Sequence, residues 1–144
     1  MTKLLRTPIR FAAPVLLFTS LAACAVIPDA ASPESVAMPQ GTPVALGQAV
    51  QVGSVVATPM EVVEDSRCPI NARCVWAGRL VVKTRIDGAG WRDTADLTLG
   101  EPWSTHDVGI ALTSGEPGRM AGEGQETPKE AYRFTYEARG DSAR

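Results

Sequence analysis

The sequence predicts an all-β fold, an antiparallel β-sandwich or a small barrel, that follows a cleaved signal peptide and a flexible tether. Short apolar stretches of alternating or β-branched residues recur over residues 44–138, and glycine or proline separates most of them. This pattern is typical of strands joined by turns. No apolar repeat at helical spacing follows the leader. About six to eight short strands over roughly 100 residues suit a sandwich or a small barrel.

Residues 1–23 have the composition of a secretory signal peptide. Lys3, Arg6 and Arg10 come first, and an apolar run over residues 11–23 ends in small residues, which is the order of charge, apolar core and cleavage site in such leaders. The run is about 13 residues long, shorter than the roughly 20 that a membrane-spanning helix needs. We therefore expect the leader to be removed.

The cysteine at the end of the leader predicts where the protein resides. The leader ends in Leu21-Ala22-Ala23 followed by Cys24, which resembles the lipobox of bacterial lipoproteins. The resemblance implies that Cys24 is acylated and begins the mature chain, and two or three acyl chains hold a protein firmly on a membrane. Ala25 rather than aspartate follows, which by analogy with enterobacterial sorting favours the outer membrane, facing the periplasm. Plain secretion with Cys24 as a stray thiol is the alternative.

The mature chain is mildly acidic. The sequence has 14 basic and 16 acidic side chains, and three of the basic ones belong to the leader, so residues 24–144 carry a net charge of about −5. This balance argues against nucleic acid as a partner, because a surface that binds nucleic acid is basic. A chain of this length suffices for one domain with a single core.

The mature chain divides into three parts. Residues 24–43 contain the lipidated cysteine and a stretch rich in alanine, proline and serine without periodicity, the composition of a flexible tether. Residues 44–138 contain the expected β-domain. Residues 139–144 are expected to be a disordered tail.

The first strands are expected before the cysteine-rich segment. Apolar residues alternate over Val44–Val52, and Gly53 ends that strand. Two β-branched stretches follow, Val55–Thr58 and Met60–Val63, and Pro59 separates them. Since proline cannot donate to a strand ladder, the pattern predicts an edge strand or a bend between two strands.

The strongest strand is expected over Val75–Ile86. Its even-numbered residues from Leu80 onwards form one face and the odd-numbered residues, among them several cations, form the other. The turn Asp87-Gly88-Ala89-Gly90 and a second alternating stretch, Trp91–Leu99, predict a hairpin.

Two registers of this hairpin stay open. One sets Arg85 opposite Arg92, which is unfavourable because like charges repel. A shift by two residues sets Lys83 opposite Asp96 but places an apolar residue beside an acid.

The last strands are expected near the C-terminus. Apolar residues alternate over residues 108–112, and aromatic residues alternate with polar ones over residues 132–137. Between them, residues 114–130 are rich in glycine, glutamate and proline and predict a long mobile loop.

The segment over residues 64–78 differs from the rest, with two cysteines, two arginines, two acids and a tryptophan. With Cys24 lipidated, Cys68 and Cys74 remain as a pair in an oxidising compartment, so we expect one disulfide. A ring of seven residues contributes roughly 2 kcal/mol. A zinc site needs about four ligands, and a catalytic thiol needs a base; His106 is the one imidazole in the sequence. Neither is expected.

The same segment contains the run Asp65-Ser66-Arg67-Cys68-Pro69 and then Cys74-Val75-Trp76-Ala77-Gly78. This arrangement, Asp-Ser-Arg-Cys-Pro followed by Cys-x-Trp-x-Gly, resembles a signature of small bacterial lipoproteins and secreted β-rich domains. The resemblance extends over roughly residues 47–136 through the strand pattern. It implies a β-rich fold, and it brings no activity with it.

We expect the motif to be structural first. Asp65 and Ser66 can accept hydrogen bonds from nearby backbone N–H groups, and Pro69 fixes the backbone inside the ring. Trp76, two residues after the second cysteine, is expected to pack over the disulfide in the core. Gly78 permits a bulge or a close approach of two backbones.

Two sets of cations are candidates for recognition. Arg73 lies in the disulfide ring, and a rigid ring lowers the entropy cost of binding an acidic partner. Arg79, Lys83 and Arg85 form a row that would suit phosphates or an acidic glycan, although such a row is more often a solvated face. Either Arg67 or Arg73 is expected to pair with Glu64 or Asp65, a pair that contributes little if it is exposed.

No catalytic set of acid, base and nucleophile can be assembled from the sequence, so we expect no enzyme, metal or cofactor. The sequence predicts a lipid-anchored, non-enzymatic binding or structural module of the bacterial envelope, with an envelope protein or a glycan as partner. The alternative is an inhibitor-like domain that presents the Cys68–Cys74 loop to an envelope hydrolase. The oligomeric state stays open.

Overall fold

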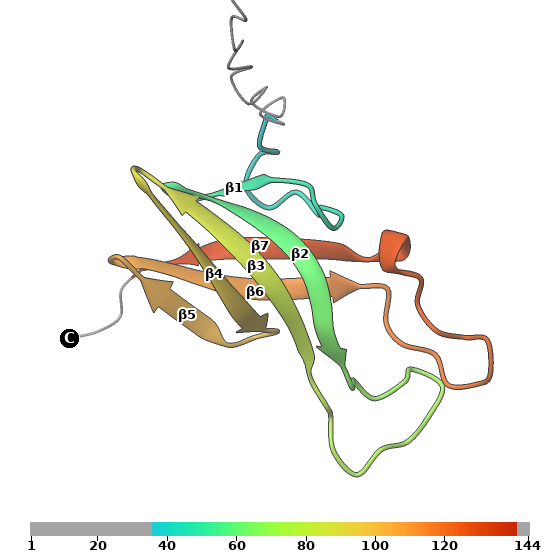
Figure 1. The fold of residues 1–144 in the computed structure, drawn as a ribbon. Coiled ribbons are helices and arrows are strands. Elements are labelled where there is room, and N and C mark those ends of the chain that lie inside the picture. The colour runs from blue at the N-terminus through green and yellow to red at the C-terminus, as the bar shows by residue number, and fades with distance from the viewer. Residues whose placement is uncertain (1–35, 141–144) are drawn as a thin grey trace, which may run out of the picture. The chain divides into compact units, whose positions relative to one another are not determined.

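The computed structural model describes residues 36–140, which form two antiparallel sheets (Figure 1). The first sheet contains β1 (Val50–Val52), β2 (Val55–Asp65), β3 (Leu80–Gly88) and β4 (Trp91–Thr98). The second contains β5 (Pro102–Thr105), β6 (Val108–Glu116) and β7 (Arg133–Arg139). Strand order follows chain order in both sheets, and the one helical element described is a short 3₁₀ turn, η1 (Lys129–Ala131). The all-β, antiparallel prediction is confirmed.

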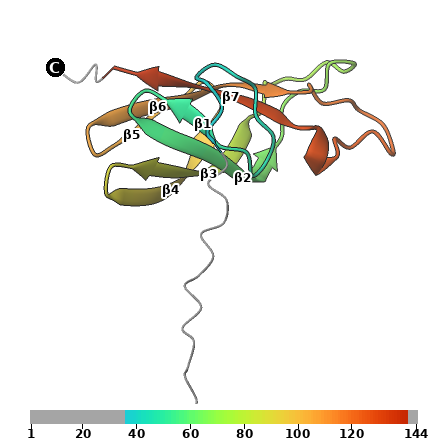
Figure 2. The same cartoon turned by 90° about the horizontal axis from the view of Figure 1, so that it is seen from above.

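The two sheets form the two layers of a small sandwich (Figure 2). Its core lies between them and contains the alternate residues of β3 and β7. The largest fully buried side chains are Tyr136, Phe134, Leu80, Ile86, Leu97, Ile110 and Leu112. Thr84 Oγ1 and Tyr136 Oη lie 3.0 Å apart in this core, so the two buried hydroxyls, one from each sheet, form a hydrogen bond with each other.

The segment before β1 closes one end of the sandwich. Val44 exchanges two backbone hydrogen bonds of 2.9 Å with Phe134, which joins it to the free edge of β7. Met38 forms a parallel bridge with Val50, and its carbonyl accepts from Gln51 N at 2.8 Å. Paired structure therefore begins at Met38, within the segment that we expected to be tether.

The predictions for the leader, for Cys24 and for the first part of the tether fall on residues 1–35, outside the described residues. Of the expected disordered tail, Arg139 belongs instead to β7, and residues 141–144 lie outside the described residues. Among residues 36–140, no helix is long and apolar enough to cross a membrane.

β2 runs through Pro59 as one strand, where we expected two strands or an edge strand. β1 pairs with β2 only as far as Ala57. Pro59 has no N–H to donate, and at this position β1 does not need one. The register with β3 shifts between Pro59 and Glu61, and such a bulge accommodates proline without ending a strand.

The hairpin of β3 and β4 adopts the register that sets Lys83 opposite Asp96. Arg85 faces Thr94 instead of a second arginine. β3 begins at Leu80, later than the expected start at Val75, because the preceding residues belong to the loop that contains the disulfide.

Candidate functional site

The loop between β2 and β3, residues 66–79, is the candidate functional site, and we call it the disulfide loop. Cys68 and Cys74 form the expected disulfide, with their Cα atoms 5.9 Å apart. Behind the ring, the two arms of the loop stay paired: Ser66 N donates to Arg79 O, and Cys68 N donates to Ala77 O, both at 2.8 Å. The ladder of β2 and β3 thus continues to the ring.

Gly78 closes the base of the disulfide loop. Its φ is +66°, a conformation that side chains other than glycine rarely adopt. A Cβ atom there would lie nearer to the carbonyl oxygen of Ser66 than the 3.0 Å that real Cβ atoms keep. The hydroxyl of Ser66 also accepts from Arg79 N at 3.0 Å. The close backbone approach is confirmed, and Ser66 accepts from a backbone N–H as expected, but from the opposite arm of the loop and not within a turn.

A buried ion pair fixes the first arm of the loop. Arg67 donates from Nε to Asp65 Oδ1 at 2.9 Å and from Nη2 to Oδ2 at 2.8 Å. Tyr132 Oη donates to the same Oδ2 at 2.8 Å. The side chains of Arg67 and Asp65 are only 16% and 7% exposed. Desolvation raises the pKa of Asp65, but the hydrogen bonds from Arg67 and Tyr132 outweigh it and hold this pKa below its usual value.

Arg67 also reaches the segment after β6. Its guanidinium donates to the carbonyl oxygens of Gly115 and Pro117, the latter at 3.0 Å. One side chain therefore links β2, the disulfide loop and the end of β6. The expected pairing of Arg67 with an acid is confirmed, and because the pair is shielded from water it is stronger than an exposed one.

Residues 114–130, which we expected to be a mobile loop, include a segment that forms hydrogen bonds with the disulfide loop and braces it. β6 continues to Glu116, which shortens the connection, and the connection bonds to the ring. Ile70 N donates to Arg119 O at 2.9 Å. Asn71 donates from Nδ2 to the Ala121 carbonyl at 3.1 Å and accepts from its N–H at 2.8 Å. The ring is thus held from the side as well as at its base.

The disulfide loop also presents apolar side chains to solvent. Trp76 is 79% exposed, and Val75 and Ile70 are exposed too. The prediction that Trp76 packs in the core is wrong. It relied on strand alternation, but β3 begins only at Leu80, and outside a strand the two-residue period does not set direction. The indole lines a shallow hollow of about 490 Å³ at the base of the loop.

The candidate cations divide into one residue without a charged partner and a row of ion-paired residues. Arg73, in the ring, is exposed and has no charged partner among the described residues. The row is paired at every position, as Arg79–Glu64 at 2.7 Å, Lys83–Glu61 at 3.3 Å and Arg85–Asp87 at 2.9 Å. Glu64 and Glu61 each offset one cation, and Asp87 is shared between Arg85 and Arg92, so the row is not the continuous basic strip that the sequence indicated.

The single histidine lies away from this loop, in the turn between β5 and β6. His106 stacks on Trp91 with ring centroids 4.2 Å apart, and its Nδ1 lies 2.9 Å from Thr105 Oγ1. Within residues 36–140, no group of three or more His, Cys, Asp or Glu side chains is placed to hold a metal ion.

Sequence reasoning missed the residues that brace the loop. Tyr132 lies 67 residues from Asp65, and Asn71 lies 50 residues from Ala121. No local sequence pattern indicates a contact between residues so far apart in the chain.

Comparison of the chain with protein-family models, curated proteins and solved structures finds no match. The function is therefore inferred from the sequence and from the geometry of the loop.

Proposed function

We propose that this protein is a lipid-anchored, non-enzymatic binding module of the bacterial envelope that presents the disulfide loop to a partner protein. The exposure of Trp76 on a braced loop carries the proposal. Tryptophan and arginine are enriched among the residues that dominate binding energy, and the disulfide loop offers both as Trp76 and Arg73. A loop that is already fixed loses little conformational freedom when it binds.

The position of the loop supports this function. β1 and the segment that leads into it lie at one end of the domain, whereas the disulfide loop lies at the other (Figure 1). A chain anchored through Cys24 would approach at the β1 end and leave the loop free to meet a partner. We place the anchor in the outer membrane, facing the periplasm.

Replacing Cys24 tests the anchor. Cells that express the wild-type chain are expected to incorporate labelled palmitate into it, and Cys24→Ala is expected to abolish the label because the acylated thiol is gone. Globomycin, which blocks removal of lipoprotein leaders, should cause the wild-type precursor to accumulate. Cys68→Ala is the control and should keep the label. Palmitate on the Cys24→Ala protein would contradict the anchor.

Replacing Trp76 tests the binding surface. Trp76→Ala should change the free energy of unfolding by less than about 0.5 kcal/mol, because the side chain makes few contacts. Recovery of a partner from envelope extracts by photo-crosslinking from position 72, which is exposed in the ring and leaves Arg73 in place, should fall about tenfold or more. Met60→Ala, which truncates an exposed apolar residue on β2, should leave recovery unchanged. Equal recovery with the wild-type and Trp76→Ala proteins would remove the loop as the binding surface.

The unpaired Arg73 favours a narrower form of this function, an inhibitor-like domain whose ring enters the acidic site of an envelope hydrolase. A disulfide ring holds a cation at a fixed position, as such a site requires. The activity of the crosslinked partner is then measured. A hydrolase inhibited by the wild-type chain but not by Arg73→Ala would establish this inhibitor-like form.

A further inference from the structure

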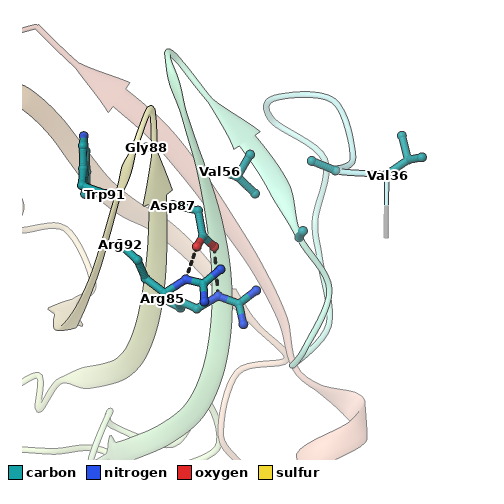
Figure 3. Close-up of a pocket in the computed structure, with 10 residues that line it drawn as sticks. Val36, Val56, Arg85, Asp87, Gly88, Trp91 and Arg92 are labelled. Atoms are coloured by element: carbon teal, nitrogen blue, oxygen red, sulfur yellow. Dashed lines mark hydrogen bonds and ion pairs between the residues drawn. The ribbon is translucent and has the colours of Figure 1, made fainter. Parts of the chain in front are cut away.

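An open pocket of about 680 Å³ lies on the outer face of the first sheet, by the turn between β3 and β4 (Figure 3). The pocket has a polar and an apolar side. The residues that matter here are Arg85, Asp87 and Arg92 on the polar side and Val36, Ala49 and Val56 on the apolar side. The pocket is far from the disulfide loop, so the function proposed for that loop makes no use of it.

Two guanidinium groups share one carboxylate on the polar side. Arg85 Nε donates to Asp87 Oδ2 at 2.9 Å, and Arg92 Nε donates to Oδ1 (Figure 3). Desolvation raises the pKa of Asp87, but hydrogen bonds from Arg92 and Arg85 outweigh it and hold this pKa below its usual value. The carboxylate is therefore ionised at neutral pH, and the three side chains together keep one positive charge.

The two arginines retain unused donors. Each is held only through Nε, so neither pair of Nη atoms has a partner among the described residues. A guanidinium has five N–H donors in one plane and matches the geometry of phosphate. The side chains of Arg85 and Arg92 are 36% and 67% exposed, so an anion can reach them. Fixed at Nε by Asp87, they are already placed for a second anion.

The position of the pocket limits the class of anion that it can bind. Val36 lies 12 residues after Cys24, which is at most about 40 Å of extended chain. A domain anchored through Cys24 thus keeps the pocket within reach of the bilayer. The apolar side suits a ligand whose phosphate is joined to an aliphatic part.

We propose that this pocket binds the phosphate of anionic lipid head groups in the membrane that carries the anchor. The location rests on the proposed anchor, whereas the chemistry of the site rests on Arg85 and Arg92. Binding would turn the β1 end of the domain toward the bilayer and the disulfide loop away from it.

The test uses the secreted, non-acylated chain Ala25–Arg144, which contains every buried core residue. It is expected to sediment with vesicles of equimolar phosphatidylcholine and phosphatidylglycerol and not with phosphatidylcholine alone. Arg85→Gln/Arg92→Gln should weaken this binding about tenfold or more, because it removes both phosphate donors. The matched control Arg79→Gln/Lys83→Gln removes the same formal charge from residues that do not line the pocket and should change binding less than about twofold. Equal losses in both double variants would overturn the pocket in favour of diffuse attraction.

Three further arms make each outcome decisive. Arg85→Lys/Arg92→Lys keeps the charge and the fold, checked by thermal unfolding, and should still bind several-fold more weakly, since lysine lacks the planar donors. Binding of inorganic phosphate without binding to vesicles would overturn the lipid as source. Trp76→Ala should bind vesicles like the wild-type chain; if it does not, the disulfide loop contacts lipid instead. No arm uses an acyl group, so failure here is distinguishable from failure of the Cys24 experiment.

Discussion

Gly78→Ala is expected to lower the free energy of unfolding by about 2–4 kcal/mol. The new Cβ would meet the carbonyl of Ser66, and because that atom is backbone, the arms of the loop must separate. Separation weakens the hydrogen bonds that Ser66 N and Cys68 N donate across the base. The positive φ adds conformational strain. Urea unfolding at neutral pH measures the loss.

Gly90→Ala is the matched control for that substitution. Gly90 also has a positive φ, +79°, but nothing lies within 4 Å of its would-be Cβ. It should lose only the strain of a left-handed residue, about 1–2 kcal/mol. If both variants lose the same free energy, the close approach at Gly78 contributes nothing.

Asp65→Asn is expected to lower the free energy of unfolding by about 2–4 kcal/mol at neutral pH. Asparagine keeps the size of the side chain, so no cavity forms, but it leaves the Arg67 guanidinium without its counter-charge in a shielded site. Glu64→Gln, which breaks the exposed pair with Arg79, is the control and should leave stability nearly unchanged.

The effect of Asp65 should depend on pH in one direction. Its pKa is lower in the folded chain than in the unfolded one, where an aspartate titrates near about 3.9. The stabilisation is therefore complete above that pH and is lost as the pH falls through the folded pKa. Unfolding curves of the wild-type and Asp65→Asn proteins should start to converge as the pH falls below about 4 and should coincide below the folded pKa. A gap that stays constant in acid would show that the charge of Asp65 is not what stabilises the loop.

The sequence indicates the strands well where one face is buried. On β3 the even-numbered residues from Leu80 to Ile86 are fully buried. Apolar and polar residues alternate in the sequence because successive side chains of a strand point to opposite faces, here the core and the outer face. The disulfide follows from the number of cysteines. The register of the hairpin was open because each alternative had one unfavourable pair, and the structure accepts the acid beside Ile86 in a register that sets Asp87 opposite Arg92.

The arrangement of the loop could not be predicted in the same way. Its braces come from Tyr132, Arg119 and Ala121, and those contacts depend on how β6 and β7 return past the ring. The two-residue period has no meaning between Cys74 and Leu80, where the chain is not a strand. Trp76 therefore faces outward although its spacing from Cys74 is that of a core pair.

The outer edge of β4 matters for proteins that crowd on a surface. β4 ends the first sheet, and an open strand edge can pair with the same edge of a neighbour. Molecules confined to a membrane would meet edge to edge at high local concentration. Asp93 lies on the same face of β4 as the buried Leu97, and an inward-facing charge on an edge strand disfavours the addition of a further strand. The same strand that completes the sheet thus keeps neighbouring copies apart.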